Sequence, residues 1–241
     1  MSQWLLAELG RGLLVGTGRR LFGGVAKLLV AALAILLLAA LATCVPGRAS
    51  KDGTMRYSGP IETGIERGEF LPGTPIQYLG KTEEGAMVSI EGQQALKKIG
   101  DSLNWVYNPV DGAAVDLNLR VLLITEDKLH VLGSTKITIL EPQPRATAIN
   151  ESAPIRYKLP VDYHIKKGQL IPGTTILYMG ETEKGAQLGN VEGYPHREAG
   201  DSIVWKGQLH DRVWLDLNLR TVLISESRLS VAGIAELSIA P

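Results

Sequence analysis

The chain has 241 residues, of which 45% are hydrophobic, and its 25 Lys and Arg balance 25 Asp and Glu. Without a basic field, nucleic-acid binding is not expected. The single cysteine, Cys44, excludes an intramolecular disulfide and a cysteine-based metal site, and we expect no metal and no cofactor.

Residues 1–20 mix apolar and basic side chains. Trp4, Leu5, Leu6 and Leu9 precede Arg11, with Arg19 and Arg20 following. An amphipathic helix lying in a membrane interface fits this mixture, although the glycines are equally compatible with a frayed segment.

Residues 21–45 predict a transmembrane helix. Lys27 is their only charged side chain, and residues 28–45 have none. About 20 residues of helix cross the hydrocarbon core of a bilayer, whereas the apolar region of a cleaved signal peptide is shorter. Leu41-Ala42-Thr43-Cys44 resembles a bacterial lipobox with an acylated cysteine, but Thr43 stands where that motif has a very small residue. We therefore favour the membrane helix and leave lipidation of Cys44 as the alternative.

Positive charges flank this span unequally and indicate its orientation. They are Arg11, Arg19, Arg20 and Lys27 on one side, and Arg48, Lys51 and Arg56 on the other. The bias predicts a cytoplasmic N-terminus. Everything after the short linker 46–55 is then extracytoplasmic, either periplasmic or extracellular.

Residues 56–141 and 156–241 are two copies of one module, in register at an offset of one hundred positions. The shared runs include Pro72-Gly73-Thr74 with Pro172-Gly173-Thr174, Gly100-Asp101-Ser102 with Gly200-Asp201-Ser202, and Asp116 to Arg120 with Asp216 to Arg220. Such a repeat indicates tandem homologous domains. It also provides a control, because residues that the fold needs recur, whereas a unique site breaks the symmetry.

Alternation with a period of two dominates both copies, as in Val115, Leu117, Leu119 and Val121. Neither copy has a convincing amphipathic helix. About six to eight short strands in each copy predict an all-β fold, with each copy a small β-sandwich or β-barrel. Residues 142–155, with three prolines, are expected to be an extended linker.

Gly100-Asp101-Ser102-Leu103 resembles the motif that carries the nucleophilic serine of GDSL hydrolases, and Asp127 to His130 resembles their second block. Those enzymes are α/β proteins whose two blocks lie far apart, whereas here both lie within one all-β copy. The second copy has Ser227 and Ser230 in place of the Asp and His. We therefore interpret the run as a turn and predict no catalytic residue.

Two sets of residues are candidates for partner binding. The first set recurs on one face of a strand and offers directional contacts to carboxylates or sugars: Asp116, Asn118, Arg120, Asp216, Asn218 and Arg220. The structural alternative, which we favour, is an internal ladder in which Arg120 pairs with Asp101 or Glu83. The second set breaks the repeat and is rich in residue types typical of binding hot spots: Tyr194, His196, Arg197 and Trp214.

These features predict a single-pass, membrane-anchored, non-catalytic binding or scaffolding protein. Its partners would be the lipid bilayer, through residues 21–45, and other subunits of a larger membrane complex. The first alternative is an extracytoplasmic, lipoprotein-like module that binds a solute or glycan. The second, least favoured, is a serine hydrolase using Ser102 or Ser202.

Overall fold

The computed structural model describes residues 48–49 and 53–241, and this part of the chain is all-β. It contains no helix, and therefore none that is long and apolar enough to cross a membrane. The predicted amphipathic segment 1–20, the predicted membrane helix 21–45 and Cys44 lie outside the described residues. The all-β class is confirmed, with several sheets in a β-sandwich-like arrangement, and the helix stays a prediction.

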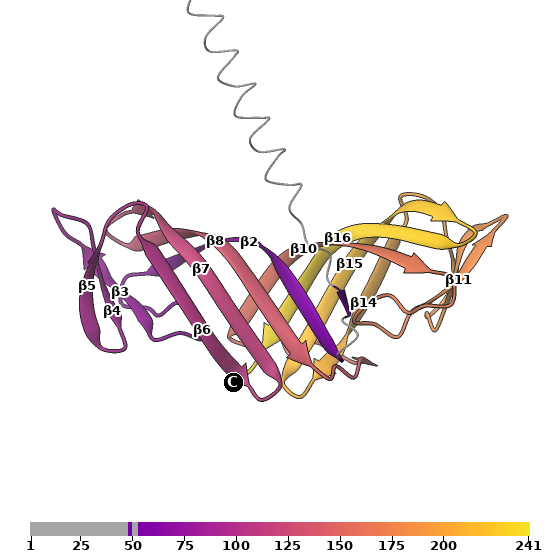
Figure 1. The fold of residues 1–241 in the computed structure, drawn as a ribbon, viewed down its shortest axis with the longest axis horizontal. Helices are drawn as coiled ribbons and strands as arrows, with labels where there is room; N and C mark the ends of the chain where they lie inside the picture. The colour runs from indigo at the N-terminus through magenta and orange to yellow at the C-terminus, as the bar shows by residue number, and fades with distance from the viewer. Residues whose placement is uncertain (1–47, 50–52) are drawn as a thin grey trace, which may run out of the picture. The chain divides into compact units, whose positions relative to one another are not determined.

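The first copy contributes two sheets (Figure 1). The larger has five strands in the order β1-β2-β8-β7-β6, and the smaller has three in the order β3-β4-β5. All pairs are antiparallel. The strands are β1 (Arg48–Ala49), β2 (Thr54–Glu66), β3 (Ile76–Lys81), β4 (Ala86–Ile90), β5 (Gln93–Lys97), β6 (Ser102–Val110), β7 (Ala113–Ile124) and β8 (Lys128–Leu140).

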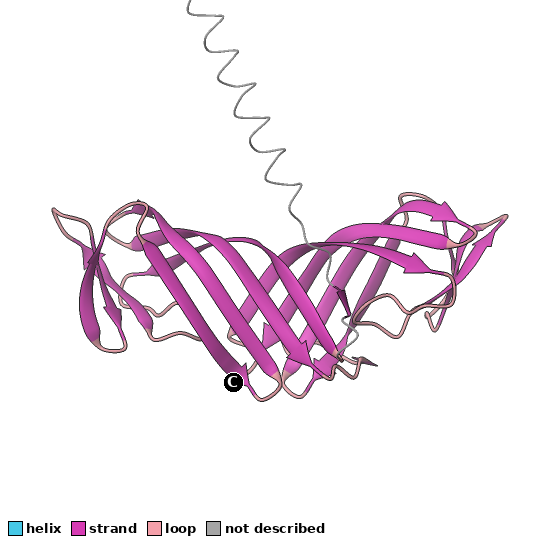
Figure 2. Cartoon of the chain, viewed as in Figure 1, coloured by secondary structure: helices cyan, strands magenta, loops and turns pink. Residues whose placement is uncertain are grey.

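The second copy repeats this arrangement, with sheets in the orders β10-β16-β15-β14-β9 and β11-β12-β13. Figure 2 shows the two sets of strands, joined by loops and turns. The strands are β9 (Arg145–Ala146), β10 (Ile155–Lys166), β11 (Leu177–Thr182), β12 (Gly185–Gly189), β13 (His196–Arg197), β14 (Ser202–His210), β15 (Val213–Ser225) and β16 (Arg228–Ile239). Apart from the two-residue strands β1 and β9, each strand has its counterpart about one hundred positions away.

Alternating side chains explain these strands. Along β7, Val115, Leu117 and Leu119 are fully or almost fully buried, while the residues between them are exposed. Strand β10 has the same period, with every second residue from Ile155 to Ile165 buried. One face of each large sheet is therefore apolar and requires a cover.

Part of the cover comes from the other copy, because buried residues of both copies form one hydrophobic core within a single compact unit. The small sheet of the same copy adds to it, since β3 contacts β8 and β11 contacts β15 and β16. The contacts are reciprocal. Gly73, in the Pro-Gly-Thr turn of the first copy, lies against Ile155 of β10, and Gly173 lies against Met55 of β2. Gly59 of β2 meets Leu159, its own counterpart in β10. The copies thus face one another across an approximate two-fold axis near Gly59 and Leu159, as the subunits of an isologous dimer do.

Tyrosines extend this shared core. The hydroxyl groups of Tyr107 and Tyr157 hydrogen-bond across the copies at 2.9 Å. The buried Tyr57 hydroxyl donates to the sulfur of Met55 at 3.1 Å. Burial raises the pKa of Tyr57, Tyr107, Tyr157 and Tyr163 above the ordinary value, so each is held in its neutral form.

Part of the proline-rich linker belongs to a sheet. Its strand β9 pairs with the outer edge of β14. Backbone bonds from Gln143 to Leu209 (2.7 Å) and from Thr147 to Lys206 (3.3 Å) continue this pairing. The linker therefore covers the edge of the second copy's large sheet.

Candidate binding sites

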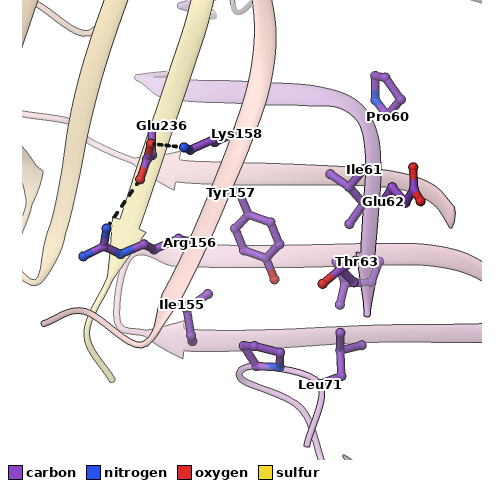
Figure 3. Close-up of a pocket in the computed structure, with 12 residues that line it drawn as sticks. Pro60, Ile61, Glu62, Thr63, Leu71, Ile155, Arg156, Tyr157, Lys158 and Glu236 are labelled. Carbon is purple, nitrogen blue, oxygen red and sulfur yellow. Dashed lines mark ion pairs between the residues drawn. The ribbon is translucent and has the colours of Figure 1, made fainter. Parts of the chain in front are cut away.

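A cavity of about 430 Å³ lies between the two copies. Its walls are β2 and the Pro-Gly-Thr turn of the first copy and the start of β10 in the second. Figure 3 shows the Tyr157 ring projecting from β10 toward Ile61 and Thr63 of β2, with Leu71 and Ile155 nearby. A mostly apolar hollow of this size fits a small organic molecule.

Charged side chains also line the cavity (Figure 3). Glu236 accepts ion pairs from Lys158 at 3.2 Å and from Arg156 at 3.6 Å. The side chain of Lys158 is 71% exposed, so solvent screens its pair and the pair adds little stability. These contacts instead place two cations beside a shared carboxylate, and Glu62 adds a second carboxylate to the lining.

The cavity breaks the internal symmetry. Thr63 lines it, whereas the equivalent residue of the second copy is Tyr163, a buried side chain with 2% exposure. The Tyr157 hydroxyl also bonds to Tyr107, for which the second copy has Gly207. On one side of the two-fold axis the Tyr163 ring fills this space. On the other side the smaller Thr63 leaves it open. This site was not predicted from the sequence, although the two copies differ visibly at Thr63 and Tyr163.

The Gly-Asp-Ser runs form turns, as interpreted from the sequence. Asp101 Oδ2 accepts a hydrogen bond from the Lys98 amide at 2.8 Å, and Asp201 Oδ2 accepts one from the Glu198 amide at 2.7 Å. Gly100 has a φ of +91°, a conformation that favours glycine. The recurring aspartates thus stabilise the turns that lead into β6 and β14.

The recurring polar set lies on the outer face of its strand. Asp116, Asn118 and Arg120 are exposed on β7 between buried residues. Arg120 Nη1 donates to the carbonyl of Gly100 at 2.9 Å, and Arg220 Nη1 donates to that of Gly200 at 3.2 Å. Within the described part of the chain no ion pair joins Arg120 to Asp101 or Glu83, so that expected pairing is wrong. The arginine instead supports the turn, because the carbonyl before the aspartate is its acceptor.

The polar residues on β7 and those on β15 differ in their ion pairs. Asp216 binds Lys206 on the neighbouring strand at 2.7 Å, and this hydrogen bond raises the pKa of Lys206. Asp116 instead lies opposite Val106 on one side and Lys136 on the other. Asn118 and Asn218 remain exposed in both copies. Within the described part of the chain, neither asparagine side chain makes a hydrogen bond, so both are available on this face.

The asymmetric set is divided between two sheets. Tyr194 is 62% exposed, and its ring lies 5.4 Å from that of His196 beside the small sheet. Arg197 is committed to the backbone, because its guanidinium donates to the carbonyls of Tyr194, His196 and Ser202. Trp214 is half-buried on β15 of the large sheet. Tyr194 is thus the member of this set that is most free to meet a partner.

A second hollow, of about 170 Å³, lies beside Ala114 on β7. Asn108, Thr138 and Leu140 are among its lining residues. The equivalent of Ala114 in the second copy is Trp214, so an indole occupies the corresponding position there. The alanine leaves a recess on the outer face of the first copy.

The histidines do not gather. His164 Nδ1 hydrogen-bonds to Ser230 at 2.9 Å, and His196 Nδ1 to Thr182 at 3.2 Å. Among residues 48–49 and 53–241, no group of three or more His, Cys, Asp or Glu is placed to hold a metal ion. No protein-family model, curated protein or solved structure matches the chain.

Proposed function

We propose that this protein is a non-catalytic binding or scaffolding protein, held in a membrane by residues 21–45 and acting as a subunit of a larger membrane complex. Its tandem domains, residues 56–141 and 156–241, stand on the extracytoplasmic side as a unit that offers surfaces to other subunits. The pattern of agreement between the copies carries this proposal. The recurring Asp101 and Arg120 bond to nearby backbone groups, while residues that differ between the copies include the exposed Tyr194.

Binding through the Tyr194 loop is tested by site-specific photocrosslinking in cells. A photoreactive phenylalanine analogue at Tyr194 is compared with the same analogue at Gln94, the equivalent exposed position in the first copy. A discrete adduct from position 194 and none from position 94 supports a specific partner. Equal labelling from both positions, or none, contradicts the proposed surface.

Membrane side is tested by adding protease to intact spheroplasts. Removal of both β domains, with an N-terminal fragment protected by the membrane, is expected. Survival of both domains until the membrane is permeabilised means that the orientation is inverted. Labelling of Ser102 or Ser202 by a serine-reactive fluorophosphonate would support the hydrolase alternative instead.

A second candidate function is the binding of a small solute in the cavity between the copies. The symmetry break at Thr63 favours it, because a residue unique to one copy opens the space beside Tyr157. An apolar molecule with a hydrogen-bonding group suits the apolar walls and the charged groups of Arg156, Lys158 and Glu236 in the lining.

The substitution Thr63→Tyr tests this candidate, because it introduces the residue that the second copy already has. Small molecules that co-purify with the full chain are extracted and compared by mass spectrometry. A compound retained by the parent and by Ser134→Tyr, an exposed control on β8, but lost from Thr63→Tyr, supports the site. A compound profile that Thr63→Tyr leaves unchanged contradicts it.

A further inference from the structure

The two large sheets end differently. Strand β14 carries the linker strand β9 on its outer edge, whereas β6, its counterpart, is the last strand of its sheet and pairs with β7 alone (Figure 1). Within the described residues, the outer edge of β6 is therefore open. An open edge presents unpaired amide and carbonyl groups that can bind another strand.

The residues of β6 do little to prevent such pairing. Its sequence from Ser102 to Val110 has no charged side chain. Val106, at its centre, is 70% exposed. The equivalent residue of the covered strand is Lys206, which binds Asp216. Proteins commonly protect open edges with lysine, and here the lysine is in the copy that does not need it.

The centre of β6 also reads alike in both directions. Val106 is flanked on each side first by an aromatic residue and then by an asparagine, in the run Asn104-Trp105-Val106-Tyr107-Asn108. In an antiparallel pair of two such strands about Val106, Asn104 faces Asn108, Trp105 faces Tyr107 and Val106 faces itself. Aromatic pairs and uncharged polar pairs are favourable across strands. The second copy reads Val204, Trp205, Lys206, Gly207 and Gln208 and lacks this symmetry.

The backbone directions agree with this register. In the second copy, the Lys206 carbonyl accepts a hydrogen bond from the Thr147 amide of the linker. This carbonyl therefore points away from β15, toward the outer edge of the sheet. Val106 has the same register against β7 as Lys206 has against β15, opposite Asp116 and Asp216 respectively. The carbonyl of Val106 accordingly points outward. Pro109, which has no amide hydrogen, lies outside the five residues that would pair.

We propose that β6 binds β6 of a second copy of this chain, so that the two five-stranded sheets join across a two-fold axis at Val106. In the second repeat, residues 156–241, the linker pairs with the outer edge of β14. In the first repeat, residues 56–141, β6 of a second molecule would pair with the equivalent edge. The pairing covers the exposed Val106 and leaves the Tyr194 loop unused, because that loop belongs to the small sheet of the other copy.

Val106→Lys tests the proposal with the full chain in detergent, by light scattering after size exclusion. The fold accommodates lysine here, since Lys206 holds the equivalent position beside an aspartate. Two lysines would meet at the axis, so the dimer dissociation constant should rise on the order of tenfold or more. Val204→Lys adds the same charge to the exposed face of the covered strand β14 and should leave the dimer unchanged.

Cross-linking tests the register. In a Cys44→Ser background, Val106→Cys should form a covalent dimer on mild oxidation, while Val204→Cys should not. A parent chain that is monomeric at micromolar concentration overturns the proposal. So does a dimer that survives Val106→Lys and is not trapped by Val106→Cys, because it then forms elsewhere. Cross-linking of Val106→Cys to a different protein, with no self-linked product, also overturns it.

Discussion

The substitution Gly73→Ala should weaken the contact between the copies. Gly73 has a φ of +76°, in the left-handed region. A Cβ atom there would lie 2.7 Å from Cδ1 of Ile155 in the other copy and 2.5 Å from the Tyr107 hydroxyl oxygen. The change therefore strains the backbone and also forces apart groups from both copies.

The expected loss has two parts. Placing alanine in the left-handed region costs about 1–2 kcal/mol. Crowding of Ile155 and Tyr107 adds about 1–3 kcal/mol, because the ends of these two side chains must move. The sum, about 2–5 kcal/mol, is a large fraction of the about 5–15 kcal/mol that stabilises a typical domain.

Gly68→Ala provides the matched control. Gly68 has a similar φ of +84°, but a Cβ atom there has no neighbour within 4 Å. It should lose the backbone part alone, about 1–2 kcal/mol. Urea unfolding of the full chain in detergent, followed by tryptophan fluorescence, measures both variants. If Gly73→Ala is no more destabilising than Gly68→Ala, the turn does not pack against Ile155, and the shared core is refuted at this contact.

Three further predictions concern hydrogen bonds and pH. Tyr107→Phe and Tyr157→Phe should each lower the free energy of unfolding by about 1–2 kcal/mol. In a double-mutant cycle measured by urea unfolding, the double variant should lose less than the sum of the single losses. Additive losses would mean that the two hydroxyl groups do not meet. Because burial raises the pKa of Tyr57, Tyr107, Tyr157 and Tyr163, the folded state prefers their neutral forms, so stability should be unaffected by them below about pH 10 and should fall as pH rises further. The urea midpoint against pH measures this effect, and ionisation of all tyrosines near pH 10 with the fold intact would contradict it. Asp201→Ala should lower the free energy of unfolding by about 1 kcal/mol, because it removes the hydrogen bond from the Glu198 amide. Glu183→Ala, an exposed control, should have no effect. Equal unfolding midpoints for the two variants would refute the role of the turn.

The sequence by itself was sufficient to predict the all-β class and the turns. Alternation such as that of Val115, Leu117 and Leu119 separates a buried face from an exposed one, and this depends on local geometry alone. The Asp101 turn is equally local, because its side chain bonds to an amide three residues away. The repeat was sufficient for the matching order of strands in both copies.

Only the tertiary structure decided what covers those faces. The packing of Gly73 against Ile155, the meeting of Gly59 with Leu159 and the cavity beside Thr63 depend on how the copies face each other. Alternation says which side chains avoid water but does not identify their partner, because hydrophobic burial has no direction. The acceptor of Arg120 was misassigned for a related reason: a guanidinium binds carboxylates and carbonyls alike, and the folded position of Gly100 selected the carbonyl.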